Sequence, residues 1–360
     1  MIPQLSKLAV AASMAAALLG TTPLAAQTAD APRSIAHAQG STPITATPQK
    51  VAVLSIAALD TLHALKIPVA GVPARSAEST VRWPQHLIEQ YTPDNGYTPI
   101  AIARGDDAAK SHLDTLQALK PDLIIVDGRT RNQYNDAKAI APTIDLSVSN
   151  ASFVDSVVQN ILTLGAVFGH EAQANAKALE LLAKVRTLRE TGAKQGTALV
   201  LFAVGDRVMP QQPDARFGMI YEVAGIRPVL TPTDGQGLST GRPPAAAAAP
   251  ANADDPAAKA AAAAAQKART EAEAQYLTDV MAREPDWLLV VDRHAAFGDP
   301  KAATNMAATP AIANSKAWQQ KKVVFLDQDG ANWYLMAGGL GLLEQNIAQL
   351  QAAFDRHQSR

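Results

Sequence analysis

The sequence predicts an α/β protein of two three-layer lobes with mainly parallel sheets, joined by one long rigid helix and with a ligand cleft between the lobes. Three observations support this fold class. A ten-residue phrase occurs once in each half, as KPDLIIVDGR at residues 120–129 and as EPDWLLVVDR at residues 284–293. Short apolar segments alternate with helical patterns in both halves. Between the halves, residues 153–192 keep helical spacing, with an interruption at Gly169.

The predicted elements follow the chain in this order. The first lobe is expected at residues 49–169, and its strands are the apolar runs 51–56, 69–72, 123–126 and, more weakly, 144–146. Helical patterns in this lobe occupy residues 59–65 and 113–119. A linking helix at residues 170–193 contains few breakers. In the second lobe, residues 194–360, the alternation of strands and helices resumes at 198–204, 220–223, 277–282, 287–291, 323–326 and 341–354.

Each copy of the repeated phrase turns at Pro-Asp, continues through four or five apolar residues, and ends at an acid followed closely by an arginine. Such an apolar run is typical of a buried parallel strand. The arginines are Arg129 in the first copy and Arg293 in the second. Because ligands bind beyond the carboxyl ends of strands in open α/β sheets, we expect both cations in one cleft.

The N-terminus has the pattern of an export signal. Lys7 precedes an apolar run at residues 8–20, and small residues follow at Ala25 and Ala26. We therefore expect a signal peptide at residues 1–26, the alternatives being an N-terminal anchor or a buried helix. Residues 27–48 are rich in Thr, Ala, Pro and Ser, which favours a flexible leader.

Composition limits the function classes. The chain has 360 residues, of which 48% are hydrophobic, enough for two cores. Its net charge is −1 with dispersed basic residues, which argues against nucleic-acid binding. The absence of cysteine excludes disulfides, thiolate metal sites and a lipid-modified cysteine. Any membrane association is therefore expected to come through a partner.

An Ala/Pro-rich insertion is expected at residues 241–275, within the second lobe. Prolines interrupt its first part, whereas residues 257–274 favour a helix but have no apolar stripe to bury. The simpler interpretation is an exposed insertion between a strand and the next helix. The alternative is a lid or a partner contact.

Arg216, in DARFG, adds a third cation after the strand that ends near residue 204. A guanidinium is always charged and presents a planar set of donors, so three of them suit an anionic, oxygen-rich ligand. The alternative is that each arginine is held by the nearest acid in a structural ion pair. Those acids are Asp127, Asp214 and Asp292.

Aromatic residues add to this candidate ligand-binding set. Trp333 and Tyr334 follow the predicted strand at 323–326, and Tyr134 follows the first copy of the repeat. A tyrosine oxygen can bind a ferric ion and a tryptophan can stack on a flat ligand, whereas the alternative is core packing. Arg75, which comes after the second predicted strand, completes the set.

With these residues identified, residues 50–360 resemble the class III periplasmic substrate-binding proteins of ABC importers, in the branch that binds ferric catecholate-type siderophores. The matching phrases are LSIAALDTLHALKIPVAGVP, LDTLQALKPDLIIVDGRT, APTIDL, RFGMIYEVAGI, EPDWLLVVDRHAAFG and WYLMAGGLGLLE. The resemblance implies capture of a ferric siderophore for delivery to an inner-membrane ABC permease. It also implies that Arg129, Arg216 and Arg293 bind the anionic chelate and that Tyr334 can complete the iron coordination.

The resemblance is incomplete at two places. Where the family has a histidine ligand, this sequence has Asp234 in TDGQGLS, so Asp234 becomes the candidate metal ligand. Acids that dock onto the permease correspond to Asp114 in the first lobe. In the second lobe the position falls on Thr278, with Asp279 beside it.

We therefore expect a soluble, monomeric periplasmic binding protein, not a lipoprotein, with no permanently bound cofactor. The sequence lacks phosphate-loop, zinc-helix and nucleophile-elbow motifs, and its seven histidines have no ligand spacing, so an enzyme is not expected. The alternatives are a haem- or cobalamin-binding protein and an exported α/β enzyme that acts on iron chelates.

Overall fold

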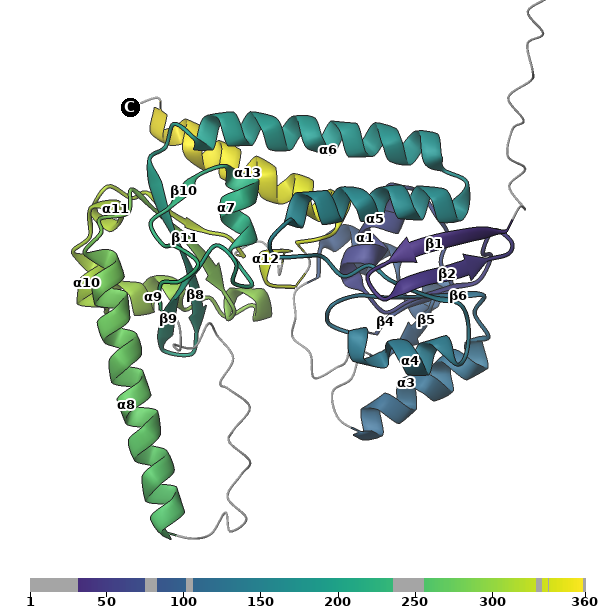
Figure 1. The fold of residues 1–360 in the computed structure, drawn as a ribbon, viewed down its shortest axis with the longest axis horizontal. Coiled ribbons are helices and arrows are strands. Elements are labelled where there is room, and N and C mark those ends of the chain that lie inside the picture. Colours follow the sequence, from purple (N-terminus) through teal and green to yellow (C-terminus); the bar gives the residue numbers. More distant parts are fainter. Residues whose placement is uncertain are drawn as a thin grey trace, which may run out of the picture.

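The computed structural model describes residues 32–74, 83–101, 106–235, 256–327, 332–335 and 337–358. The predicted signal peptide, Arg75 and residues 241–255 of the predicted insertion lie outside this set. The described chain forms two α/β lobes side by side (Figure 1). The predicted fold class is thereby confirmed.

The first lobe is built on a five-stranded parallel sheet with the strand order β5-β4-β3-β6-β7. Its strands are β3 (Val51–Val53), β4 (Gly71–Pro73), β5 (Thr98–Ile100), β6 (Leu123–Val126) and β7 (Thr143–Asp145). Its helices are α1 (Ile56–Ala64), α2 (Gln85–Gln90), α3 (Asp106–Leu119) and α4 (Tyr134–Lys138). Alternate residues of β3 and β6 enter two different apolar clusters, because successive side chains of a strand point to opposite faces. The sheet is therefore buried on both faces, and the lobe has three layers.

The segment predicted as a flexible leader forms a hairpin instead. Strands β1 (Arg33–His37) and β2 (Gly40–Ile44) pair antiparallel, and Ile35 and Ile44 are buried in the core. The Thr42 hydroxyl donates to the carbonyl of Thr143, 2.7 Å away, which fixes the hairpin to β7. The prediction of a loose segment at 27–48 was wrong for these strands, because their few inward-facing apolar residues have partners only in the folded lobe.

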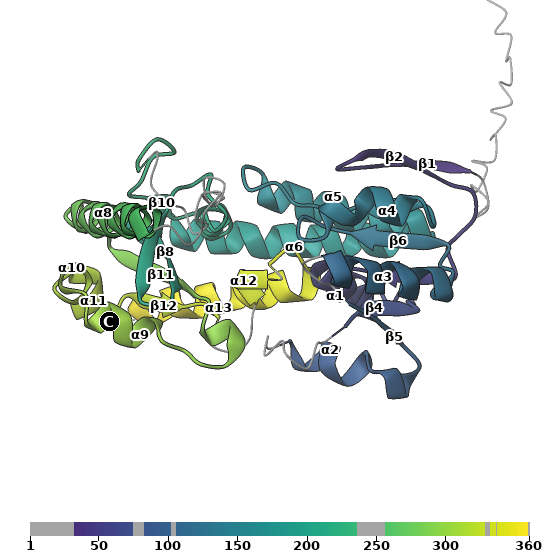
Figure 2. The ribbon, with the colours of Figure 1, turned by 90° about the horizontal axis from the view of Figure 1, so that it is seen from below.

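Long helices lie along the junction of the two lobes. Helix α5 (Phe153–Phe168) ends at Gly169, whose φ of 72° makes the turn into α6 (Glu171–Gly192). The predicted linking helix corresponds to α6, and α13 (Leu340–Gln358) runs beside it (Figures 1 and 2). Helix α6 therefore carries the chain from the first lobe to the second, and α13 packs beside it.

The second lobe contains a mixed sheet with the order β10-β8-β11-β12, in which β9 pairs antiparallel with β8. Its strands are β8 (Thr197–Val204), β9 (Arg207–Gln211), β10 (Arg227–Pro228), β11 (Trp287–Asp292) and β12 (Val323–Phe325). Its helices are α7 (Met219–Ala224), α8 (Pro256–Met281), α9 (Ala302–Ala307), α10 (Pro310–Ala313), α11 (Lys316–Gln319) and α12 (Asn332–Leu335). The apolar run at 220–223 thus belongs to a helix.

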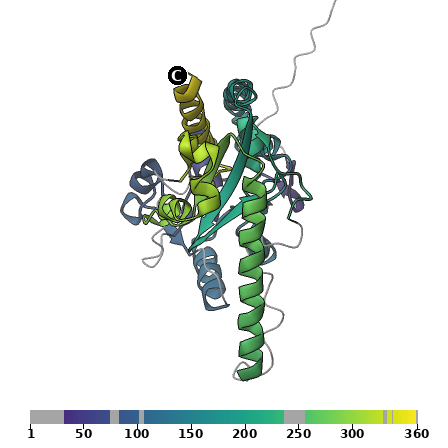
Figure 3. The same ribbon diagram turned by 90° about the vertical axis from the view of Figure 1, so that its left-hand side faces the viewer.

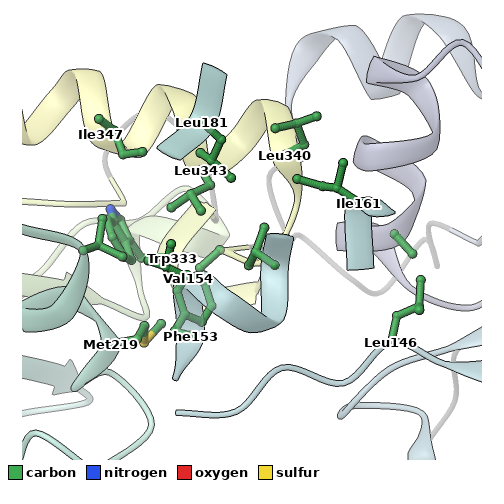
Figure 4. Packing of buried hydrophobic residues seen from close by; sticks show 14 of the residues in the cluster. Leu146, Phe153, Val154, Ile161, Leu181, Met219, Trp333, Leu340, Leu343 and Ile347 are labelled. Atoms are coloured by element: carbon green, nitrogen blue, oxygen red, sulfur yellow. The ribbon is translucent and has the colours of Figure 1, made fainter. Parts of the chain in front are cut away.

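A continuous hydrophobic core links the lobes. One cluster includes inward-facing residues of both sheets together with residues of α5, α6 and α13. Figure 4 shows Phe153, Met219 and Trp333 close to Leu343 of α13 in this cluster. Because the same apolar cluster contains residues of both lobes, their separation would expose buried surface.

Helix α8 extends well beyond the second lobe (Figures 1 and 3). Its Ala-rich N-terminal part is exposed, whereas Leu277, Val280 and Met281 near its end are buried against the sheet. The expected helix within the insertion is thus present. Among the described helices, none is both long and apolar enough to cross a membrane.

Candidate functional site

The repeated phrase folds in the same way in both lobes. Lys120 and Glu284, which precede the Pro-Asp turn, both have a left-handed φ of 51°. The acids that follow, Asp122 and Asp286, accept backbone N–H groups at the start of β3 and of β8, at distances of 2.7 to 2.9 Å. The sequence repeat is therefore also a repeat of backbone conformation and strand pairing.

The ends of the two copies differ by one residue. Asp127 accepts the N–H of Arg129 at 2.9 Å, whereas Asp292 accepts the N–H of His294 at 2.8 Å. When these acids are matched, Arg129 corresponds to His294, and Arg293 comes one residue earlier. The expectation of two equivalent strand-end arginines is thus corrected, because β11 is longer than β6.

Arg216 and Arg293 meet at Tyr334. The Arg216 guanidinium donates to the backbone carbonyl of Tyr334. The Arg293 Nε donates to the Tyr334 hydroxyl at 3.3 Å. Arg293 follows the last residue of β11, so the cluster lies at the carboxyl edge of the second sheet. Arg216 is exposed and Arg293 is half-buried.

An aromatic group supports these charges. The rings around Tyr334 are those of Phe202, Phe217 and Phe297, with centroids 6.0, 6.3 and 6.1 Å from its own. The Arg216 guanidinium lies 4.8 Å from the Tyr334 ring, and that of Arg293 lies 4.8 Å from the Phe297 ring. Cation–π attraction therefore helps to orient both guanidinium groups.

Arg129 lies on the facing edge of the first lobe. It follows the end of β6, and β3 is the parallel neighbour of β6. Ile56, just beyond β3, packs against Ala296 and Leu342 next to Tyr334. The carboxyl edges of the two sheets therefore face each other, and the exposed Arg129 lies on the edge opposite Arg293.

Two predicted aromatic ligand contacts are wrong. The Trp333 side chain is 1% exposed and belongs to the core, and Tyr134 is buried in the first lobe beside His37. A side chain without accessible surface cannot stack on a bound ligand. The residues of the Trp-Tyr pair have different environments, since Trp333 is in the core and Tyr334 is half-buried at the sheet edge.

Asp234 belongs to an ion pair. Its two carboxylate oxygens accept from the Arg283 guanidinium at 2.7 and 3.0 Å, and the Thr231 N–H donates to it at 2.6 Å. The hydrogen bonds from Arg283 hold the pKa of Asp234 well below its usual range. The Asp234 carboxylate is thus engaged by Arg283 and Thr231, and its role as a metal ligand stays a prediction. Within the described ranges, no group of three or more acidic or histidine side chains could hold a metal ion.

The two candidate docking acids are both exposed. Asp114 lies on α3, and Asp279 lies near the end of α8, where it accepts from Gln275 at 2.8 Å. Asp114 therefore lies on the first lobe and Asp279 on the second.

Sequence reasoning missed Asp327, which is fully buried beside the cluster. Its Oδ1 accepts the N–H groups of Trp333 and Tyr334 at 2.9 and 3.0 Å. Burial raises the pKa of Asp327 to about 7, against the effect of these two N–H groups. A signal was available, because Asp327 follows β12 closely, as Asp127 follows β6, and Asp292 is the last residue of β11.

The fold and this sheet-edge cluster define a two-lobe binding protein, and the chain belongs to the periplasmic binding protein family, whose sequence model matches residues 51–329. It is 27% identical over 351 residues to the ferric-anguibactin-binding protein FatB of Vibrio anguillarum, covering 93% of each chain. It is 25% identical over 312 residues to the petrobactin-binding protein YclQ of Bacillus subtilis, covering 86% of this chain and 83% of YclQ.

Solved structures share the fold. The crystal structure of YclQ gives a TM-score of 0.69 at 24% identity, covering 90% of this chain and 98% of that one. The siderophore-binding protein BauB, bound to a complex between two molecules of acinetobactin and ferric iron, gives 0.67 at 24% identity with the same coverage. The two-lobe architecture is therefore common to these proteins.

Proposed function

We propose that this protein is the periplasmic binding component of an ABC importer and captures an anionic ferric siderophore. The observation that carries the proposal is the convergence of Arg216 and Arg293 on Tyr334 at the sheet edge that faces Arg129. Charge-assisted donors of this kind suit carboxylate and catecholate oxygens. The names of the relatives FatB and YclQ, which refer to ferric anguibactin and petrobactin, agree with this ligand class.

The preferred ligand is a catecholate-type complex in which the chelator supplies most of the iron coordination. Ferric iron prefers hard oxygen donors, and Tyr334 presents a phenolic oxygen beside Arg293. Asp234 is engaged by Arg283. Iron is the cargo here, and Tyr334 is the residue that would touch it.

The protein would act as a monomer without an attached lipid and deliver its cargo to an inner-membrane permease. Asp114 and Asp279, exposed on different lobes, are the acids proposed to contact that permease. Capture would occur without catalysis, and recovery of an unchanged ferric complex after prolonged incubation with the protein tests this point.

Binding is tested by titration calorimetry with ferric catecholate, hydroxamate and citrate complexes, and with haem. We expect the catecholate complex to bind most tightly. Arg129→Ala, Arg216→Ala and Arg293→Ala should each weaken binding by about 1.5 to 3 kcal/mol, roughly tenfold to 150-fold in affinity. The matched control is Arg207→Ala, which removes an arginine of the same lobe that is paired with Glu273. Equal affinity of all three variants and the wild type would contradict the arginine site, and preference for haem would favour the other ligand class.

A further inference from the structure

Tyr334 lies in α12, and we call α12 together with residues 337–342 the Tyr334 segment. A buried carboxyl group holds the start of this segment. Asp327 is fully buried and accepts, through one oxygen, the N–H groups of both Trp333 and Tyr334. Two hydrogen bonds from consecutive amides to one oxygen fix the orientation of the backbone that carries the tyrosine.

A second buried carboxyl group, from the other lobe, holds the end of the segment. Asp60 on α1 is 1% exposed, and its Oδ2 accepts the N–H of Leu342 at 3.0 Å. The hydroxyl of its neighbour Thr61 accepts the N–H of Leu340 at 3.1 Å. The other oxygen of Asp60 is 2.9 Å from the His86 Nε2, which fixes the carboxyl plane.

The approach of this segment to Asp60 is very close. A Cβ atom added to Gly339 would lie 2.7 Å from the Asp60 Oδ2, so a larger residue there would displace the Asp60 carboxyl group. The end of the Tyr334 segment is therefore seated directly on α1 of the first lobe.

We propose that Asp327 and Asp60 are positioning residues for the ligand, and that they hold the Tyr334 segment from both ends. The proposal rests on the proposed function, since it concerns how Tyr334 is presented to the chelate. A binding group must be held to within about 0.5 Å of its working position by the residues behind it. Because Asp60 belongs to the first lobe, it also ties the position of Tyr334 to the lobe that carries Arg129.

The test compares affinity for the ferric catecholate complex in variants of both acids. Asp327→Ala and Asp60→Ala should each raise the Kd by about tenfold to 100-fold, as expected when residues that orient a ligating group are removed. Asp327→Asn keeps one acceptor oxygen of the same size and should recover most of the affinity that Asp327→Ala loses. This recovery separates positioning from the loss of a charge.

A double-mutant cycle with Tyr334→Phe distinguishes positioning from general damage. If both acids act through Tyr334, replacing either acid by alanine in the Tyr334→Phe background should raise the Kd by less than about threefold. Asp286→Ala is the matched control, because Asp286 accepts an N–H group at the opposite edge of the second sheet and should leave affinity unchanged. If an alanine variant loses its cooperative unfolding transition, Thr61→Val takes the place of that variant in the cycle. This substitution removes one hydrogen-bond acceptor for the same segment.

The outcomes separate the two proposals. Two outcomes would overturn the positioning role alone. One is that the alanine variants lose affinity equally in the wild-type and Tyr334→Phe backgrounds. The other is that Asp327→Ala and Asp60→Ala bind as tightly as the wild type while Arg293→Ala binds more weakly. Absence of binding by the wild-type protein to every complex would overturn the proposed function itself.

Discussion

At the residue scale, the carboxylate of Asp234 shows how a local partner decides the role of a side chain. It faces the Arg283 guanidinium through two hydrogen bonds, and its exposure is only 20%. The Arg283 guanidinium favours the charged form of the Asp234 carboxyl group, so the pKa of Asp234 in the folded protein is lower than the usual 3.8. The stabilising contribution is therefore fully present above pH 3.8 and is lost as the pH falls through the lower, folded-state pKa.

Asp234→Ala should lower the free energy of unfolding by about 1 kcal/mol at pH 7, since Arg283 is partly exposed and screened by solvent. The difference from the wild type should shrink at the acidic end of a urea-unfolding series from pH 7 down to pH 2 or so. Asp279→Ala, which alters a more exposed acid, serves as the control. An equal loss at every pH would show that the ion pair is not the source of the effect.

Also at the residue scale, the sequence pointed to some members of the candidate site and missed others for a clear reason. Arg216, Arg293 and Tyr334 follow apolar strands, and this position is visible in the chain itself. Asp60 accepts from Leu342, which is 282 residues later, and no local pattern reports such a contact. The burial of Trp333 likewise depends on α13 and α5, which pack around it only in the folded protein.

At the element scale, Glu222 of α7 caps a helix that begins in another part of the fold. Its carboxylate accepts the N–H groups of Phe153 and Val154 at 2.8 and 3.2 Å, at the start of α5. Ser152, the N-cap residue of α5, makes no side-chain capping bond. Arg189 of α6 donates to the carbonyl and the carboxylate of Glu222, so three helices meet at this acid.

Glu222→Ala should therefore destabilise the protein by about 1 to 3 kcal/mol, the range for loss of a cap and of a charge-assisted hydrogen bond. Urea unfolding followed by circular dichroism measures the change. Glu190→Ala, which removes an exposed acid one residue from Arg189, should change stability by less than about 0.5 kcal/mol. Similar losses in both variants would contradict the capping role.

Elements that the sequence predicted well are those whose signal is local. The run at 123–126 coincides with β6, and the run at 287–291 lies within β11, because strands buried on both faces are continuously apolar. The hairpin β1–β2 lies outside the two main sheets, and only a few of its residues face the core. The short apolar run at 220–223 has no periodicity that separates strand from helix, and α7 is formed there.

At the scale of the whole molecule, the two lobes share their stabilising contacts. One apolar cluster contains residues of both sheets, and α6 and α13 pack together along both lobes. Asp60 reaches from the first lobe to the start of α13, and Glu222 reaches from the second lobe to the start of α5. Each lobe thus supplies an acid that caps a helix continuing into the shared core.

We therefore expect the lobes to unfold together, although two-domain proteins often unfold in separate steps. Hydrogen exchange measured at increasing urea should show protection lost in β3 and β6 at the same concentration as in β8 and β11. Glu222→Ala should lower the urea concentration at which protection is lost equally for both sheets, because the substitution destabilises the common core rather than one lobe. Loss of protection in one sheet at clearly lower urea would show two independent folding units, and the lobes would then have to be held in register by the bound ligand instead of by α5, α6 and α13.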